Sequence, residues 1–189
     1  HSALNAAAAA ILAAILGVDW ESIIQPLEDF QGVERRLERL GTFTCRGGGE
    51  ALVYDDYGHH PTEIEITLRA LRAAELPKRL ICVFQPHQHS RTRFLLDQFA
   101  QSFSSADEVV VPHIYFVRDS IAEQHRISAQ DLVDKLVDQG VSAKNINEFD
   151  DIVNHLRTTA RDGDLIVIMG AGPVTSIAHS LVDQAKVAP

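Results

Sequence analysis

Residues 53–62 read VYDDYGHHPT, and this stretch decides the fold that we expect. The apolar approach over 51–54 is typical of a buried strand, and Pro61 with Thr62 opens a helical pattern. Between strand and helix lie two carboxylates, an aromatic ring, a glycine and two imidazoles. In open α/β sheets, ligands bind where strands end and helices begin, because side chains converge there and helix N-termini favour negative ligands. We therefore expect a functional site at this point of a parallel sheet.

A simpler interpretation of the same stretch is a polar turn followed by a helix cap. Thr62 and Glu63 would be sufficient for such a cap. Two aspartates and two histidines within six residues are more than a turn needs, and such clusters are typical of functional sites. The functional interpretation is therefore favoured, with the cap as its alternative.

Helix and strand patterns alternate through the rest of the chain. The sequence predicts helices over 64–74, 94–103, 131–139, 150–161 and 175–186, and strands over 79–84, 108–111, 145–149 and 164–169. Upstream, two short strands over 37–44 and 51–54 are joined through Gly47-Gly48-Gly49, which favours a hairpin. This order predicts an α/β fold, a Rossmann-like and mostly parallel sheet of about six strands with helices on both faces.

The N-terminal part has a different character. Residues 6–16 form an alanine-rich helical pattern that Gly17 ends, and apolar side chains on nearly every face require a large packing partner. A second helical pattern covers 20–30, and a charged segment over 31–40 follows it. Because the first helix starts without a cap or a preceding strand, we expect the tail of a longer protein. The expected domains are 1–36 and 37–189.

Composition excludes several classes of function. The formal charge of −9 and the pI near 5.4 argue against a general affinity for nucleic acid or anionic membranes, so any anion site must be a local cluster of Arg and His. No apolar run reaches the roughly 18 residues of a membrane-spanning helix. Cys82 lies in an apolar run and Cys45 near a loop, so a reducing, cytoplasmic compartment is expected for a soluble globular protein.

Two further strand ends carry polar or glycine signals. Residues 84–93 read FQPHQHSRTR, a histidine-rich and basic loop, but no cysteine or carboxylate accompanies the histidines, so a metal site is disfavoured. For Arg91, exposure at a helix start and contact with an anion are equally good interpretations. Residues 169–175 read MGAGPVT, where the missing third glycine and the proline favour a tight turn over a dinucleotide site. The sequence contains no P-loop motif.

Four segments together resemble the C-terminal part of the Mur ligases of bacterial peptidoglycan synthesis. They are DDYGHHPTE at 55–63, FQPH at 84–87, SRTR at 90–93 and MGAG at 169–172, and the first two together are highly specific. The resemblance covers nearly the whole chain, because 1–5 is similar to a helix start in the family's central ATPase domain and 32–36 to its interdomain hinge. It implies two helices of the ATPase domain followed by the family's C-terminal domain.

The activity that this resemblance implies is ATP- and Mg²⁺-dependent. The lactyl carboxylate of UDP-N-acetylmuramate is phosphorylated, and the amine of L-alanine then attacks the acyl phosphate. The P-loop, the Mg²⁺ ligands and the UDP-binding domain would lie upstream of these 189 residues, so this piece is expected to be inactive alone. We expect no nucleic acid partner and no membrane insertion.

The resemblance also implies roles for individual residues. Those implied to bind ATP are Asn5 and Tyr57 at the adenine, Arg36 near the nucleotide, and Asp56 at the ribose. His59 is implied as the catalytic residue, facing the phosphate and the amino acid. Arg91 is implied to bind the carboxylate of L-alanine, with His87 in the same substrate site, and none of these residues is implied to bind a metal.

The sequence departs from the family pattern at Ser2, Gln88, His89 and Pro173. Gln88-His89 replace an Arg-Tyr pair, which removes one of two basic contacts that the resemblance implies for L-alanine. Two alternatives stay open. One is the tripeptide ligase of murein recycling, which shares much of the first run but not the second. The other is a non-catalytic ligand-binding module on the same scaffold.

Overall fold

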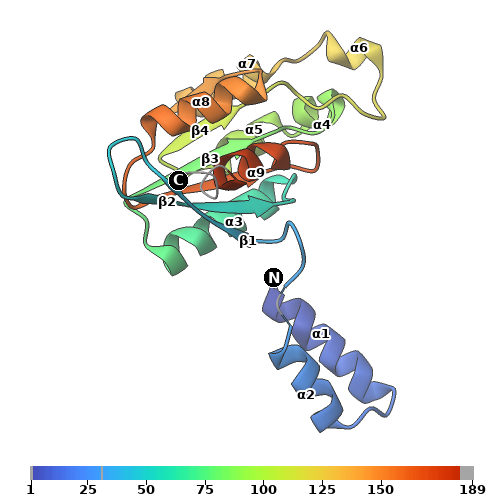
Figure 1. The fold of residues 1–189 in the computed structure, drawn as a ribbon. Helices are drawn as coiled ribbons and strands as arrows, with labels where there is room; N and C mark the ends of the chain where they lie inside the picture. The colour runs from blue at the N-terminus through green and yellow to red at the C-terminus, as the bar shows by residue number, and fades with distance from the viewer. Residues whose placement is uncertain (1, 31, 184–189) are drawn as a thin grey trace. The chain divides into compact units, whose positions relative to one another are not determined.

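The computed structural model describes residues 2–30 and 32–183 (Figure 1). The chain passes from one compact unit to a second between Glu34 and Arg35, and we describe each unit by itself. The predicted end of the last helix at residue 186 lies outside the described residues, as does His1 of the N-terminal motif. None of the helices in the described ranges is long and apolar enough to cross a membrane.

The first unit consists of two helices, α1 (Ser2–Ile15) and α2 (Trp20–Glu28), close to the two predicted ones. Asp19 caps α2 by accepting a backbone hydrogen bond at 3.0 Å. Within the unit several large apolar side chains remain more than half exposed, namely Leu12, Ile15 and Leu16. Two short helices cannot enclose a core between them. Within this unit, the apolar side chains therefore lack the large packing partner that the sequence predicts.

The second unit is built on a six-stranded sheet in the order β1-β2-β6-β3-β4-β5. The hairpin strands β1 and β2 are antiparallel, and all other neighbours are parallel. The mostly parallel α/β sheet of six strands is therefore confirmed. The strands are β1 (Glu38–Thr44), β2 (Glu50–Asp56), β3 (Arg79–Phe84), β4 (Glu108–Val111), β5 (Ala143–Asn145) and β6 (Asp164–Met169).

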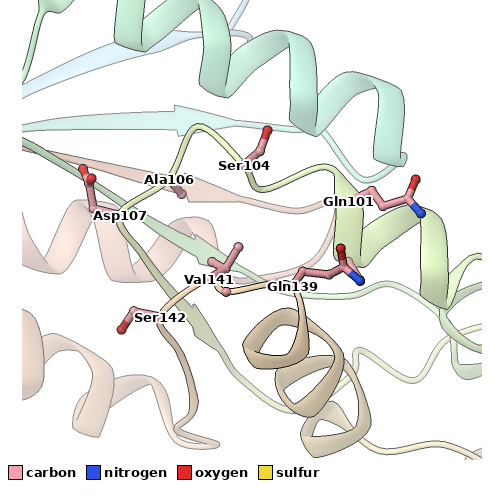
Figure 2. A pocket seen from close by; sticks show the side chains of 9 residues that line it. Gln101, Ser104, Ala106, Asp107, Gln139, Val141 and Ser142 are labelled. Carbon is pink, nitrogen blue, oxygen red and sulfur yellow. The ribbon is translucent and has the colours of Figure 1, made fainter.

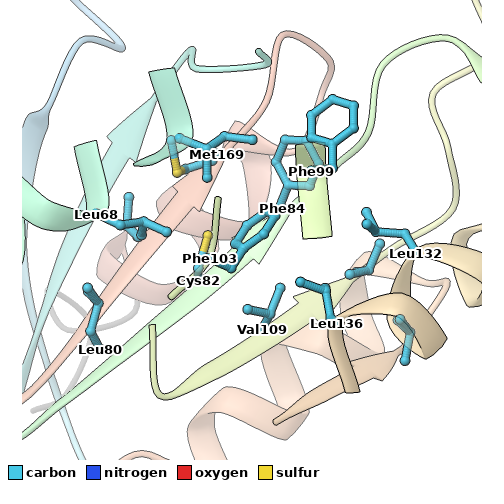
Figure 3. Packing of buried hydrophobic residues seen from close by; sticks show 14 of the residues in the cluster. Leu68, Leu80, Cys82, Phe84, Phe99, Phe103, Val109, Leu132, Leu136 and Met169 are labelled. Atoms are coloured by element: carbon cyan, nitrogen blue, oxygen red, sulfur yellow. The ribbon is translucent and has the colours of Figure 1, made fainter. Parts of the chain in front are cut away.

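Helices cover both faces of this sheet and enclose two cores. Alternate side chains of β3 point to opposite faces, so Cys82 and Phe84 enter one core while Ile81 and Val83 enter the other. Figure 3 shows part of the first core, which α3, α5 and α7 cover; α8 and α9 cover the second. These helices are α3 (Pro61–Glu75), α5 (Leu96–Gln101), α7 (Ala129–Asp138), α8 (Phe149–Thr159) and α9 (Thr175–Asp183).

Some local predictions were wrong because tertiary contacts override the local pattern. The helix predicted over 94–103 is two helices, α4 (His89–Phe94) and α5, separated at Leu95. The strand predicted over 145–149 lies earlier, at 143–145, where β4 pairs with it. The strand predicted over 51–54 continues through both aspartates, because β6 pairs with them in register. The short helix α6 (Ile121–Gln124) was not predicted.

Candidate functional site

The three strand ends that carry polar or glycine signals share one edge of the sheet. β6 lies between β2 and β3, and Met169 pairs in register with both Asp56 and Phe84. The segments that follow these strands therefore leave the sheet side by side at its carboxyl edge. This edge is where open α/β sheets bind ligands.

Asp56 closes the end of β2 and holds the turn that follows. One carboxylate oxygen accepts from the Gly58 backbone N–H at 2.7 Å, and the other accepts from Leu37 N–H at 2.8 Å. The residue is only 2% exposed, and this burial raises the pKa of its carboxyl group. The structure thus gives Asp56 a positioning task, and the ribose contact that the resemblance implies stays a prediction.

The two histidines of the turn have different tasks. His60 is the N-cap of α3, since its ring accepts from Thr62 N–H, while Glu63 accepts from the His60 backbone in a capping box. The cap interpretation is therefore correct for His60, although Thr62 itself is not the cap. The His59 ring does not cap the helix, although the His59 backbone N–H also donates to Glu63, at 3.0 Å. Nδ1 of His59 lies 3.2 Å from the Tyr57 carbonyl oxygen, and the His59 side chain is 25% exposed.

Arg35 ties the hinge to the sheet edge. Its Nε lies 3.2 Å from Oδ2 of Asp55, a carboxylate that is 1% exposed, and its Nη2 donates to the Gly170 carbonyl at 2.6 Å. Thr175 of α9 donates to the same Asp55 oxygen at 2.6 Å. The sequence indicated a basic hinge but did not indicate this anchoring role, because no local pattern reveals a contact between residues so far apart in the chain.

Tyr57 lies between the hinge and the turn. The guanidinium carbons of Arg35 and Arg36 lie 5.1 and 5.3 Å from the centre of its ring, within the range of cation–π contacts. Arg36 also lies 3.6 Å from the Glu63 carboxylate and is 41% exposed. Together Tyr57 and Arg36 present an aromatic and cationic surface beside the hinge.

His87 brings the second strand end next to the first. The centres of its ring and of the His59 ring are 6.0 Å apart. Arg91 belongs to α4, which begins two residues after His87 at the same edge of the sheet. Burial lowers the pKa of His87, and the positive charge of Arg91 lowers it further. His87 is therefore expected to be neutral at pH 7.

The glycines after β6 are required by close packing. A Cβ atom on Gly170 would lie 2.9 Å from the Gln85 carbonyl oxygen, at a φ of +147°. A Cβ atom on Gly172 would lie 2.6 Å from Oε1 of Gln85. This geometry supports the interpretation as a tight turn rather than as a dinucleotide site.

Several buried polar atoms at this edge have no hydrogen-bond partner among the described residues. They are Oδ1 of Asp55, Oε1 of Gln85, Nδ1 of His87 and Nδ1 of His89. All four belong to the end of β2, to the loop after β3 or to the first residue of α4. Buried polar groups normally find a partner, so this concentration is typical of a surface that binds a ligand.

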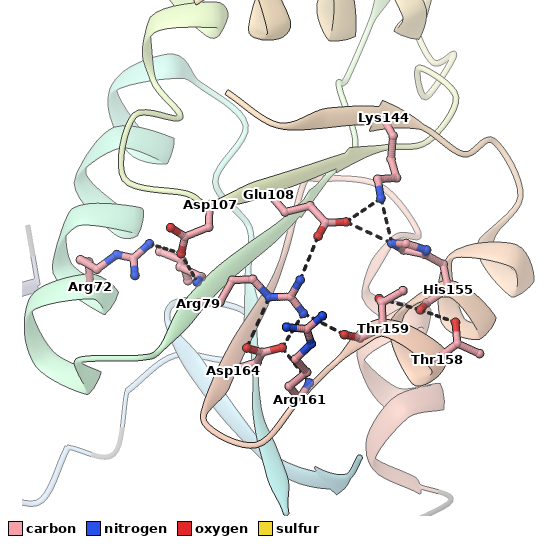
Figure 4. Close-up of polar contacts among 11 residues, drawn as sticks. Arg72, Arg79, Asp107, Glu108, Lys144, His155, Thr158, Thr159, Arg161 and Asp164 are labelled. Atoms are coloured by element: carbon pink, nitrogen blue, oxygen red, sulfur yellow. Dashed lines mark hydrogen bonds and ion pairs between the residues drawn. The ribbon is translucent and has the colours of Figure 1, made fainter. Parts of the chain in front are cut away.

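Two hollows at the opposite edge of the sheet do not suit catalysis. One of about 450 Å³ contains a single ionisable side chain, Asp107 (Figure 2). Asp107 pairs with Arg72, which lies outside this hollow. The other, of about 760 Å³, contains a network in which Glu108 contacts Arg79, Lys144 and His155 (Figure 4). Arg79 also pairs with Asp164 at 2.6 Å, so two carboxylates balance the charges of Arg79 and Lys144, and we interpret the network as structural.

The remaining expectations concern a metal and Asn5. The part of the chain that the structure describes holds no group of three His, Cys, Asp or Glu residues able to bind a metal ion. Asn5 lies on α1 in the first unit, and the contact with adenine that the resemblance implies stays a prediction.

Known proteins are similar to this chain in sequence. Residues 35–172 match the family described as "Mur ligase, glutamate ligase domain". The UDP-N-acetylmuramate–L-alanine ligase of Desulfitobacterium hafniense is 41% identical over 182 residues, which is 96% of this chain and 39% of that protein. The chain thus spans about two fifths of the length of the curated relatives that it matches.

Two solved structures are similar to this fold. The UDP-N-acetylmuramate–alanine ligase of Thermotoga maritima is 25% identical, with a TM-score of 0.75, and the match covers 100% of this chain and 38% of that one. A murein peptide ligase from Psychrobacter arcticus is 26% identical, with a TM-score of 0.69, over 98% of this chain and 37% of that one.

Proposed function

This chain belongs to the Mur ligase family, and from that membership we propose that it is the C-terminal portion of an ATP-dependent ligase. The proposed reaction adds L-alanine to UDP-N-acetylmuramate through an acyl phosphate, in peptidoglycan precursor synthesis. The helices of residues 1–36 would then be the end of the central ATPase domain. The observation that carries the proposal is the convergence of His59, His87 and Arg91 at one sheet edge beside a basic hinge.

His59 is the proposed catalytic residue. Its Nδ1 faces a carbonyl oxygen, which can only accept a hydrogen bond, so we assign the proton to Nδ1. The other ring nitrogen, Nε2, then carries a lone pair. It can accept a proton from the alanine amine as this amine attacks the acyl carbon and phosphate leaves.

His87 and Arg91 are the proposed binding residues for the amino acid. The Arg91 guanidinium is suited to a carboxylate because its planar fork can donate two parallel hydrogen bonds. A neutral His87 next to it adds no positive charge that would repel the ammonium group of L-alanine. The two residues therefore suit the two ends of an amino acid.

ATP supplies the phosphoryl group that activates the lactyl carboxylate. Tyr57 and Arg36 fit this role, because an aromatic ring can pack against adenine and a guanidinium can face phosphate. Asp56 would support them by holding the turn that presents Tyr57, and Asn5 would contact adenine. The described residues do not form a Mg²⁺ site, so we propose that its ligands lie in the upstream domains.

Two other functions lead to different experimental results. A tripeptide ligase of murein recycling is one, since a murein peptide ligase shares the fold at 26% identity. A non-catalytic module is the other. The relative that is 41% identical carries the name of the alanine-adding enzyme, and this favours our proposal.

The test is ligase activity of the full-length protein that contains this chain. We expect ADP release that depends on both UDP-N-acetylmuramate and L-alanine. Release that depends on a tripeptide instead would identify the recycling enzyme, and no release with either would identify the module. We place this reaction in the cytoplasm, and we expect the 189 residues alone to be inactive.

A substitution at Arg91 tests the assignment of the amino acid site. In the full-length enzyme, Arg91→Ala should raise the KM for L-alanine by about ten-fold or more, because a charge-assisted hydrogen bond is lost. The KM for ATP should change far less. Equal changes in both KM values would refute the assignment.

A further inference from the structure

The loop that precedes α6 is hydrogen-bonded to the loop that precedes α4, and it contains a second arginine, Arg118. The backbone of Tyr115 donates to the Pro86 carbonyl at 2.8 Å and accepts from Gln88 N–H at 3.0 Å. The Gln88 side chain donates to the carbonyl of Arg118 at 3.3 Å. Arg118 is thereby held next to the start of α4, close to His87.

Strained backbone accompanies this contact. Gln88 has a φ of +68° and Arg118 a φ of +48°, values that residues other than glycine rarely adopt. Such conformations persist only where the surroundings enforce them, and they concentrate at ligand sites. A third contact enforces them here, since Asp119 accepts from Ser90 N–H at 2.8 Å.

The arginines of this region differ in whether their charge is neutralised. Arg93 and Arg126 both pair with Glu123, at 2.8 and 3.0 Å. Within residues 2–30 and 32–183, by contrast, Arg91 and Arg118 have no ion pair. Burial is the main reason why the pKa of His87 is lowered. The positive charges of Arg91 and Arg118 both lower this pKa further.

We propose that Arg118 is a specificity-determining residue which, with Arg91, binds the carboxylate of the incoming amino acid next to His87. Two uncompensated guanidinium groups beside a neutral imidazole form a local anion site in a chain of net charge −9. The choice of an amino acid carboxylate rests on the proposed function. In this site Gln88 is a positioning residue, because its side chain fixes the backbone of Arg118.

The test compares three variants of the full-length ligase: Arg118→Ala, Arg118→Lys and, as control, Arg126→Ala. The control removes an exposed arginine from the same region that is paired with Glu123. Arg118→Ala should raise the KM for L-alanine about ten-fold or more, Arg118→Lys should recover part of this loss, and Arg126→Ala should leave KM unchanged. Turnover with L-alaninamide, which lacks the carboxylate, should be the same in all three.

Two results of this assay would overturn the proposal. One is an equal KM for L-alanine in Arg118→Ala and Arg126→Ala. The other is an equal loss with L-alanine and L-alaninamide, because a purely structural role would affect both substrates.

A binding measurement on the 189-residue chain keeps this proposal separate from the proposed function. Acetate and inorganic phosphate are titrated while the His87 imidazole is followed by NMR. Acetate should shift the His87 signals, and Arg118→Ala should weaken that effect about ten-fold while Arg126→Ala does not. Acetate binding that is unchanged in Arg118→Ala, or tighter binding of phosphate than of acetate, would refute the carboxylate site. A full-length protein without ligase activity would refute only the proposed function.

Discussion

At the scale of single residues, neighbours of the same type in the sequence take up unrelated tasks. His59 and His60 are adjacent, yet one faces the His87 ring and the other caps α3. Arg35 and Arg36 are adjacent too, but Arg35 holds a buried carboxylate while Arg36 is 41% exposed. Residue type limits what a side chain can do, and backbone direction decides which neighbour it reaches.

A glycine substitution tests how tightly the carboxyl edge is packed. Gly170→Ala should lower the free energy of unfolding by about 1–3 kcal/mol, because the new Cβ would lie 2.9 Å from a backbone oxygen at a φ of +147°. Urea unfolding measures the change. Gly47→Ala is the matched control, since a Cβ there would have no atom within 4 Å. Equal stability of the two variants would show that the turn can relax.

At the scale of elements, the site depends on how segments from different strands are fastened together. Asp55 of β2 accepts from Arg35 of the hinge and from Thr175 of α9. Asp56 of the same strand accepts from the hinge at Leu37 and from the turn at Gly58. The end of β2 therefore organises the hinge, the turn and the last helix.

The hinge contact can be tested by its effect on stability. Arg35→Ala should lower the free energy of unfolding by about 1–3 kcal/mol, because Asp55 is almost completely buried and would lose its cationic partner. Arg36→Ala should change stability by less than about 0.5 kcal/mol, since its ion pair is partly exposed. Thermal and urea unfolding of both variants give the comparison. A larger loss in Arg36→Ala would contradict this view of the hinge.

At the scale of the whole second unit, the two edges of the sheet have different electrostatics. The carboxyl edge presents His87, Arg91 and Arg118, which form no ion pair within residues 2–30 and 32–183, together with buried polar atoms that lack a hydrogen-bond partner there. The amino edge contains a network of ion pairs in which Glu108 joins β3, β4, β5 and α8. One edge is therefore suited to binding, and the other to holding the strands together.

The ion-pair network predicts a loss of stability in acid. Burial alone would raise the pKa of Glu108, but hydrogen bonds from Lys144 and His155 outweigh it and lower the pKa below the ordinary 4.5. A carboxylate with a lowered folded-state pKa stabilises the fold above the unfolded-state pKa and loses that effect as pH falls. The stability difference between parent and Glu108→Gln should thus be full above about pH 5 and decrease below pH 4.5.

Urea unfolding between pH 3 and 6, in about half-unit steps, measures this difference. Glu65→Gln serves as the control, because Glu65 is 54% exposed and its ion pair with Arg69 is 3.9 Å long. A difference that does not change with pH would show that Glu108 contributes through packing rather than through its charge.

The sequence alone determined the type and order of most elements. Three strands have the predicted bounds, because long apolar runs buried on both faces leave no other local solution. It also indicated the three strand ends that form the candidate site. Tertiary structure decided the rest: the break at Leu95, the anchoring by Arg35 and the position of Arg118. The physical reason for the last two is that they depend on hydrogen bonds and charges between segments 20 to 135 residues apart, which local patterns do not encode.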